Sequence, residues 1–201
     1  MESISASSDF PARAAARPAR LEPVTSSWNP LVWLALAAYR AATGGTSPIR
    51  IIFARAPRLI LAHLILITTA EYGLSLDRRL RALARVFGSR VNGCLFCDDL
   101  ETRIAIQHRA ISQEDADALP HFATSERFSP RERAALRYVE ELNTTRRAGD
   151  GVFEDLKRHL SEREIVELTW LNAVGNYLNL QAKPLGLLPD DACALPGAGP
   201  R

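Results

Sequence analysis

Two short segments of the chain, residues 129–132 and 161–164, carry the pattern Ser-x-x-Glu ahead of apolar residues at helical spacing. In such a capping box the serine hydroxyl accepts a hydrogen bond from the backbone amide three residues later, and the glutamate accepts one from the amide of the serine. No run alternates long enough to form a strand, and no segment repeats. The sequence therefore predicts an all-α fold with about seven to nine helices.

Caps and breakers define further helices in the first third of the chain. Asn29 followed by Pro30 predicts the start of a helix that runs to about residue 42, before the glycine pair 44–45. A second apolar stretch follows, and it must break or kink at Pro57 because proline cannot continue a helical hydrogen-bond ladder.

The best-defined amphipathic helix lies in the middle of the chain. We expect Ser75 to cap it and the Asn92-Gly93 pair to end it, with the next helix beginning at or just before Cys94. A shorter helix is expected over 152–159. The apolar positions of the middle helix lie on one stripe of a 3.6-residue period: Leu76, Leu80, Leu83, Ala84, Phe87 and Val91.

The distribution of residue types suggests one helical domain between two disordered tails. Residues 1–25 mix Ser, Ala, Pro and Arg without periodicity, which is typical of a flexible arm. Residues 189–201 have the same character and are expected to form a flexible tail, with Cys193 incidental. The helical domain should therefore span residues 26–188.

The composition argues against several classes of function. The 201 residues carry a net charge of +2, with basic and acidic residues interspersed, so we expect no nucleic-acid partner. The first 22 residues lack the apolar core of a signal peptide, and the most apolar run, 59–70, is about half as long as a membrane span. Three cysteines do not suggest a disulfide framework. These features predict a cytoplasmic protein that does not enter membranes.

Cys94 and Cys97 form a C-x-x-C pair at the first turn of a predicted helix. The unpaired amides and the positive dipole end there stabilise a thiolate, and this spacing lets the two sulfurs form a disulfide. One alternative is half of a zinc site, but a second C-x-x-C and a histidine at finger spacing are missing. Another is a pair of small buried apolar side chains. We treat the pair as the candidate redox site and expect no metal.

The last predicted helix, 165–183, carries no charged residue between positions 168 and 182, so it should be buried on most sides. Its polar exceptions are Asn172, Asn176 and Asn179, which share one face. Two interpretations stay open. The amides either hydrogen-bond a neighbouring helix or a subunit interface, or they line a substrate pocket.

The nine residues 89–97 read S-x-x-N-G-C-x-x-C between two predicted helices, and helical segments at 128–143 and 160–179 follow. In this motif and order the chain resembles the carboxymuconolactone decarboxylase and alkylhydroperoxidase D (AhpD) superfamily over roughly residues 48–188. The resemblance implies an AhpD-like helical bundle in which helix, turn and helix form the active-site unit. It also implies a homo-oligomer.

The resemblance assigns roles to the two cysteines. In the peroxidase branch the second cysteine attacks the peroxide and the first resolves the sulfenic acid, so Cys97 would be peroxidatic and Cys94 resolving. A glutamate twelve residues before the first cysteine and a histidine four residues after the second relay protons in that branch. Here those positions hold Ala82 and Glu101. The relay therefore does not carry over.

Glu101 lies one helical turn after Cys97, on the same face. An ionised carboxylate there, together with the two aspartates that follow Cys97, would disfavour a thiolate. Glu101 could instead accept the thiol proton as a general base. It could also be an ordinary helix residue in a salt bridge with Arg103 or Arg90.

Three classes of function are consistent with these features. The first is a thiol-dependent oxidoreductase, a peroxidase or disulfide reductase that acts on a small-molecule hydroperoxide or disulfide and is re-reduced by an unidentified protein. The second is a non-redox decarboxylase or isomerase-type enzyme, which the changed relay and the asparagine stripe favour. The third is a non-catalytic oligomeric binding protein. The retained dithiol favours the first, with Cys94, Cys97 and Glu101 as candidate catalytic residues and no cofactor.

Overall fold

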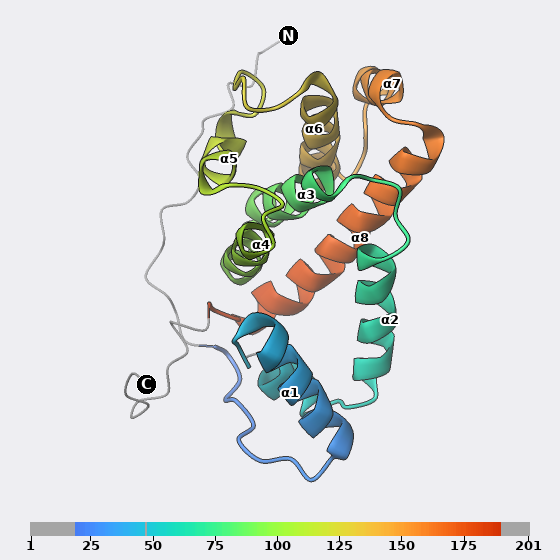
Figure 1. Ribbon diagram of the computed structural model, residues 1–201. Helices are drawn as coiled ribbons and strands as arrows, with labels where there is room; N and C mark the ends of the chain where they lie inside the picture. Colours follow the sequence, from blue (N-terminus) through green and yellow to red (C-terminus); the bar gives the residue numbers. More distant parts are fainter. Residues whose placement is uncertain (1–18, 47, 190–201) are drawn as a thin grey trace.

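The computed structural model describes residues 19–46 and 48–189 (Figure 1). Within these ranges the chain forms eight α-helices, one π-helical turn (η1) and one short 3₁₀ helix (η2), and no strand. The all-α prediction is therefore confirmed. In chain order the elements are α1 (Pro30–Thr43), η1 (Ile49–Phe53), α2 (Leu59–Glu71), α3 (Arg78–Val91), α4 (Leu95–Gln107), α5 (Gln113–Ala118), η2 (Leu119–His121), α6 (Pro130–Thr145), α7 (Asp150–His159) and α8 (Glu162–Leu185).

Helix α3 lies at the centre of the bundle, where α4, α6 and α8 pack around it (Figure 1). The apolar stripe predicted for this helix is its buried face. Leu80 and Leu83 are fully buried, and Val91 at the end of the stripe is partly buried. Leu136 of α6 and Leu168 of α8 are fully buried in the same core. Burial of a leucine contributes roughly 2 kcal/mol, so this face fixes the helix that leads into the dithiol.

Both predicted capping boxes are present. The Ser129 hydroxyl accepts a hydrogen bond from the amide of Glu132, whose carboxylate accepts one from the Ser129 amide, at the start of α6. Ser161 and Glu164 make the same pair of bonds at the start of α8. A third box begins α5, where no cap was predicted.

The prediction that Ser75 caps α3 is wrong. The N-cap is Asp77, whose carboxylate accepts a hydrogen bond from the amide of Leu80 at 2.8 Å. Ser75 instead donates its amide and its hydroxyl to Glu167 of α8, at 2.6 and 2.8 Å. A carboxylate at the N-cap also complements the helix dipole, so Asp77 suits the position once Ser75 is engaged elsewhere.

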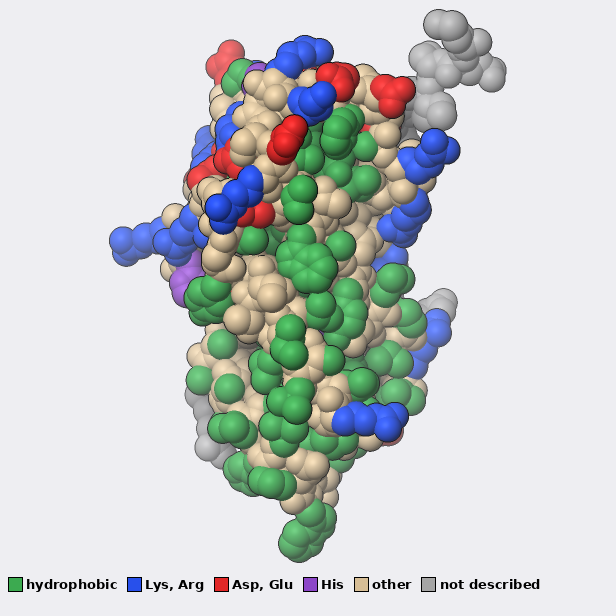
Figure 2. Space-filling view, turned by 90° about the vertical axis from the view of Figure 1, so that its right-hand side faces the viewer, with side chains coloured by type: hydrophobic (Ala, Val, Ile, Leu, Met, Phe, Trp, Pro, Cys, Tyr) green, Lys and Arg blue, Asp and Glu red, His purple; other side chains and the backbone are tan. Residues whose placement is uncertain are grey.

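Helices α1 and α2, with η1, form the lower part of the molecule in Figure 1. Val32, Phe53 and Ile60 are buried together there, and the break expected at Pro57 lies between η1 and α2. Figure 2 shows the side of the molecule that lies to the right in Figure 1. On this side, hydrophobic side chains gather over the lower part, and charged side chains are more frequent above. In the described part of the chain, no helix combines the length and hydrophobicity that crossing a membrane requires.

The predicted N-terminal arm is described only from residue 19. The amide of Arg20 donates to the carbonyl oxygen of Leu185 at 3.0 Å. The amide of Val24 donates to the carbonyl oxygen of Arg50 at 3.1 Å. This stretch therefore lies against the helical domain. Residues 1–18 of the predicted arm, and the predicted tail from residue 190 onward with Cys193, lie outside the described residues.

Candidate functional site

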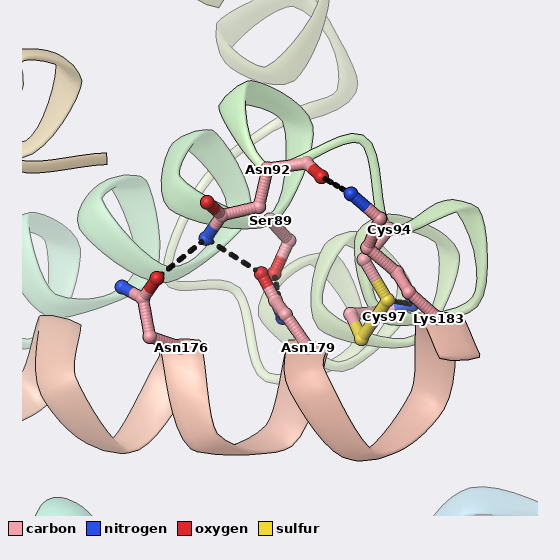
Figure 3. The surroundings of a disulfide bond; sticks show 7 residues. All are labelled: Ser89, Asn92, Cys94, Cys97, Asn176, Asn179 and Lys183. Atoms are coloured by element: carbon pink, nitrogen blue, oxygen red, sulfur yellow. Dashed lines mark hydrogen bonds between the residues drawn. A yellow bond between two sulfur atoms is a disulfide. The ribbon is translucent and has the colours of Figure 1, made fainter. Parts of the chain in front are cut away.

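The candidate site is built on the turn between α3 and α4 (Figure 3). Gly93 has a φ of +64°, a left-handed conformation that glycine adopts without steric cost. The next residue, Cys94, donates its amide to the carbonyl oxygen of Ser89 at 3.0 Å and is the N-cap of α4. The Asn-Gly pair therefore ends α3 as predicted and brings the first cysteine to the start of the next helix.

Cys94 and Cys97 are joined as a disulfide, with their Cα atoms 5.3 Å apart. The expectation that the two sulfurs approach closely enough to bond is met. The amide of Cys97 donates a hydrogen bond to the sulfur of Cys94 at 3.3 Å. The helix N-terminus therefore directs an amide at Cys94, the residue to which the family resemblance gives the resolving role.

Both cysteines are buried, with exposed fractions of 2% for Cys94 and 5% for Cys97. Their cover is apolar and comes from distant parts of the chain: Ala19, Ile51, Ile52, Phe96, Leu100, Ala182, Leu185 and Leu187. This burial restricts the access of a reagent to both sulfurs. Ala19 packs against the cluster that contains both cysteines, and the amide of the next residue, Arg20, donates to the carbonyl oxygen of Leu185 at 3.0 Å.

Two of the three predicted asparagines on α8 hold the turn that precedes the dithiol. The side-chain amide of Asn92 donates to the side-chain oxygen of Asn179 at 2.8 Å and to that of Asn176 at 3.3 Å (Figure 3). Asn179 is buried and donates to the hydroxyl of Ser89 at 3.5 Å. The amides of α8 therefore fix the position of the Asn-Gly turn relative to the helix beneath it.

The third predicted asparagine, Asn172, pairs with the buried Asn143 of α6. Each side chain donates to the other, at 3.0 and 3.2 Å, and Asn176 also donates to Asn143 at 2.7 Å. Gly88 of α3 packs against this pair, because a Cβ atom there would lie 3.3 Å from the amide nitrogen of Asn143. The three asparagines thus make hydrogen bonds to residues of neighbouring helices. This agrees with the interpretation that their amides bond a neighbouring helix.

Lys183 of α8 is a neighbour of the dithiol that the sequence argument missed. Its ammonium group donates to the carbonyl oxygen of Asn92, and its side chain lies beside the disulfide in Figure 3. A cation near a thiol stabilises the thiolate. No local sequence pattern marks this lysine, because it lies 91 positions from Asn92.

Glu101 forms a two-pronged ion pair with Arg85 of α3, with nitrogen–oxygen distances of 3.0 and 3.1 Å. The prediction that Glu101 pairs with Arg103 or Arg90 is therefore wrong. Arg85 approaches from the helix packed against α4, where it also pairs with Glu71. Its side chain and that of Glu101 are 22% and 12% exposed, so the pair is largely shielded from water.

The two aspartates that follow Cys97 are also paired with arginine. Asp98 contacts Arg90 at 2.7 Å, and Asp99 contacts Arg103 at 3.3 Å. Together with the pair at Glu101, these contacts place one guanidinium beside each acidic group near the dithiol. The negative charge expected to disfavour a thiolate is therefore offset by positive charge from α3 and α4.

A cavity of about 290 Å³ lies between the end of α2, α3 and α4. Both positions at which the family relay is replaced, Ala82 and Glu101, line it, whereas Asn172, Asn176 and Asn179 do not. Its full lining is Glu71, Tyr72, Arg78, Arg81, Ala82, Arg85, Glu101, Ile104, Ala105, His108 and Ala110. Among residues 19–46 and 48–189, no group of three or more His, Cys, Asp or Glu side chains is arranged to hold a metal ion.

Known proteins share the all-α fold of this chain. The sequence profile of the carboxymuconolactone decarboxylase family matches residues 62–141, which include α3, the dithiol turn and α4. The uncharacterised protein YdfG of Bacillus subtilis (strain 168) is 28% identical over 96 residues. That match covers 47% of this chain and 65% of YdfG, a little under two thirds of this relative.

Two solved structures share the architecture. The debrominase Bmp8 in its apo form has a TM-score of 0.74 at 20% identity, over 85% of this chain and 91% of its own, which is a likeness of fold. ATU0492 from Agrobacterium tumefaciens, a protein of unknown function described as a candidate antioxidant defence protein AhpD, has a TM-score of 0.62 at 28% identity. That likeness covers 68% of this chain and 94% of ATU0492. The profile match over residues 62–141 and the likeness to ATU0492 support a relationship to the carboxymuconolactone decarboxylase and AhpD superfamily.

Proposed function

We propose that this protein is a dithiol–disulfide oxidoreductase that cycles Cys94 and Cys97 and reduces a small hydroperoxide. The observation that carries the proposal is the bonded pair of sulfurs at the N-terminus of α4. The amide directed at Cys94, the ammonium group of Lys183 nearby and the arginine partners of the adjacent acids all favour sulfur in its anionic form. The likeness to ATU0492, described as a candidate AhpD, supports the same direction.

In the proposed cycle the thiolate of Cys97 bonds to one peroxide oxygen as the oxygen–oxygen bond breaks. The alkoxide leaves as an alcohol after taking a proton, and Cys97 becomes a sulfenic acid. The thiolate of Cys94 then attacks the sulfur of Cys97, and the displaced hydroxide leaves as water. The two protons consumed are those released by the two thiols. A dithiol reductant protein supplies two electrons and two protons to restore the pair.

The burial of the pair makes access a part of this cycle. Because neither sulfur is exposed, we propose that the apolar cover around Ala19 and Leu187 opens to admit the peroxide and the reductant. We place the cycle in the cytoplasm, where a pool of reduced thiols can regenerate the dithiol. Glu101 receives no proton-transfer step here, since both of its oxygens are engaged by Arg85.

The proposal is tested by counting thiols after treating the reduced protein with a hydroperoxide. A Cys193→Ser parent removes the third cysteine from the count. We expect this parent to lose both remaining thiols and to form an intrachain disulfide, detected by mass spectrometry. Cys97→Ser in the same parent should retain its thiol, whereas Cys94→Ser should stop at a sulfenic acid that dimedone traps.

Two results would contradict the proposal. If both thiols survive excess peroxide, the dithiol is not the reacting group, and a non-redox enzyme of the same superfamily becomes the better account. The charged cavity at the replaced relay positions is the observation that favours that second function. If Cys94→Ser retains its thiol while Cys97→Ser forms the sulfenic acid, the two roles are exchanged, as the amide contact to Cys94 would allow.

We also propose that the protein is a homo-oligomer in which a second copy of the chain covers the outer face of α2. Residues 59–70 contain no Asp, Glu, Lys or Arg, yet Leu61 and Ile65 are 59% and 65% exposed. A face without charge suits an identical apolar face related by a two-fold axis. Light scattering should give a multiple of the 22.2 kDa chain mass, and Ile65→Glu should reduce that multiple. A monomeric parent protein would overturn this assignment.

A further inference from the structure

The cavity between α2, α3 and α4 has an arginine-rich wall. Arg78, Arg81 and Arg85 lie three and four residues apart on α3, so their side chains leave the same face of the helix, and all three line the cavity. Glu71 and Glu101 are the acidic residues of the lining. The wall thus holds three permanent positive charges against two carboxylates.

The ion pairs within the cavity leave two of these arginines without an acidic partner. Arg85 pairs with both Glu71 and Glu101. Within the described chain, Arg78 and Arg81 have no carboxylate within 4 Å and donate only to backbone carbonyl oxygens, those of His108 and Glu71. The Nε of Arg81 is also shielded from water and has no acceptor among the described residues. The cavity therefore holds positive charge that no described side chain neutralises.

Apart from His108, the rest of the lining is mostly apolar, and three of its residues are alanines. Ala82, Ala105 and Ala110 leave space where longer side chains would fill it, and Ile104 and Tyr72 complete an apolar surface. The volume of about 290 Å³ exceeds the roughly 150 Å³ apolar cavity that holds benzene. Glu71, Tyr72, Arg78 and His108 are exposed, so the cavity opens to solvent. A ligand that fits has a compact apolar body and a negatively charged end.

We propose that this cavity binds a small organic carboxylate, with its charge at Arg78 and Arg81 and its apolar body against the alanines. A planar carboxylate matches the fork of a guanidinium and accepts two hydrogen bonds from it. The inference stands apart from the proposed dithiol cycle, because binding needs no change at either sulfur. It assigns a ligand class to the position where the family proton relay is replaced.

The test compares three probes by isothermal titration calorimetry on the full chain. Benzoate has both the charge and the apolar body, benzamide keeps the ring without the charge, and acetate keeps the charge without the ring. We expect benzoate to bind most tightly and its affinity to fall as salt is added, because the contact is between charges. Equal affinities for benzoate and benzamide, or no heat from benzoate, would overturn the proposal.

Variants locate the site. Arg81→Gln should weaken benzoate about tenfold or more, as expected for the loss of a charged hydrogen-bond donor. Ala82→Leu narrows the cavity without changing its charge and should also weaken benzoate binding. Arg137→Gln, on the exposed surface of α6 and outside the cavity lining, is the matched control and should bind like the parent. Unchanged benzoate affinity in folded Ala82→Leu would show that the anion binds elsewhere.

Because the thiol count and the benzoate titration are separate measurements, either proposal can fail alone. If the protein binds benzoate but its thiols survive peroxide, the proposal of a carboxylate site stands and the proposal of a redox function fails. If the protein loses its thiols but does not bind benzoate, the redox proposal stands and the carboxylate site fails.

Discussion

Replacing Arg85 by glutamine should make the dithiol harder to ionise. Cys97 and Glu101 are four residues apart on α4, which puts their Cβ atoms about 6 Å apart. Without the guanidinium, the carboxylate of Glu101 faces a thiolate of Cys97 with no compensating charge. At about 6 Å and an effective dielectric constant of about 40, two like charges repel by about 1.4 kcal/mol, a factor of about ten in the thiolate population.

The assay is the pH dependence of alkylation of the reduced protein by iodoacetamide. A parent with Cys94→Ser and Cys193→Ser leaves Cys97 as the single thiol. The midpoint of the profile should rise by about one pH unit in Arg85→Gln, in line with the tenfold loss of thiolate. The midpoint, unlike the absolute rate, does not depend on how often the apolar cover opens.

A double variant separates charge from structure. Adding Glu101→Gln to Arg85→Gln removes the uncompensated carboxylate, so the midpoint should return close to that of the parent. Arg137→Gln, which removes an exposed arginine of α6, should leave the midpoint unchanged. If Arg85→Gln alone has the midpoint of the parent, then Cys97 does not sense the charge of Glu101, and the electrostatic reasoning is refuted.

Two further predictions concern stability. Gly88→Ala places a Cβ atom 3.3 Å from the amide nitrogen of Asn143 and should cost about 1–3 kcal/mol in a thermal unfolding experiment. Gly175→Ala, also inside a helix but with no atom within 4 Å, should stabilise by up to about 1 kcal/mol, and equal effects would argue against the close packing at Gly88. The hydrogen bond from Arg131 lowers the pKa of Glu164 from 4.5 to about 2. Because this pKa is lower in the folded than in the unfolded chain, the stability gained is full above about pH 4.5 and is lost toward pH 2. Glu164→Gln should therefore flatten the fall of Tm over this range, and a parallel fall in both proteins would contradict the assignment.

The parts of the fold that the sequence determined are those that rest on near neighbours. Ser129 and Ser161 cap their helices with partners three residues away, so the sequence pattern alone was sufficient to predict where these helices begin. The stripe of α3 and the position of Cys94 at the start of α4 follow from spacing along one helix and from the Asn-Gly turn. The approach of the two sulfurs is equally local, because three residues separate them.

The tertiary structure decided the partners and the accessibility of these groups. Several arginines lie near Glu101 in the sequence, and only the packing of α3 against α4 selects Arg85. Ser75 does not cap α3, because it is hydrogen-bonded to Glu167 of α8, which lies 92 positions away in the sequence. Burial of the dithiol depends on Ala19 and Leu187, which lie near opposite ends of the described chain. Such contacts depend on how helices pack, and the spacing of residues within one helix carries no information about them.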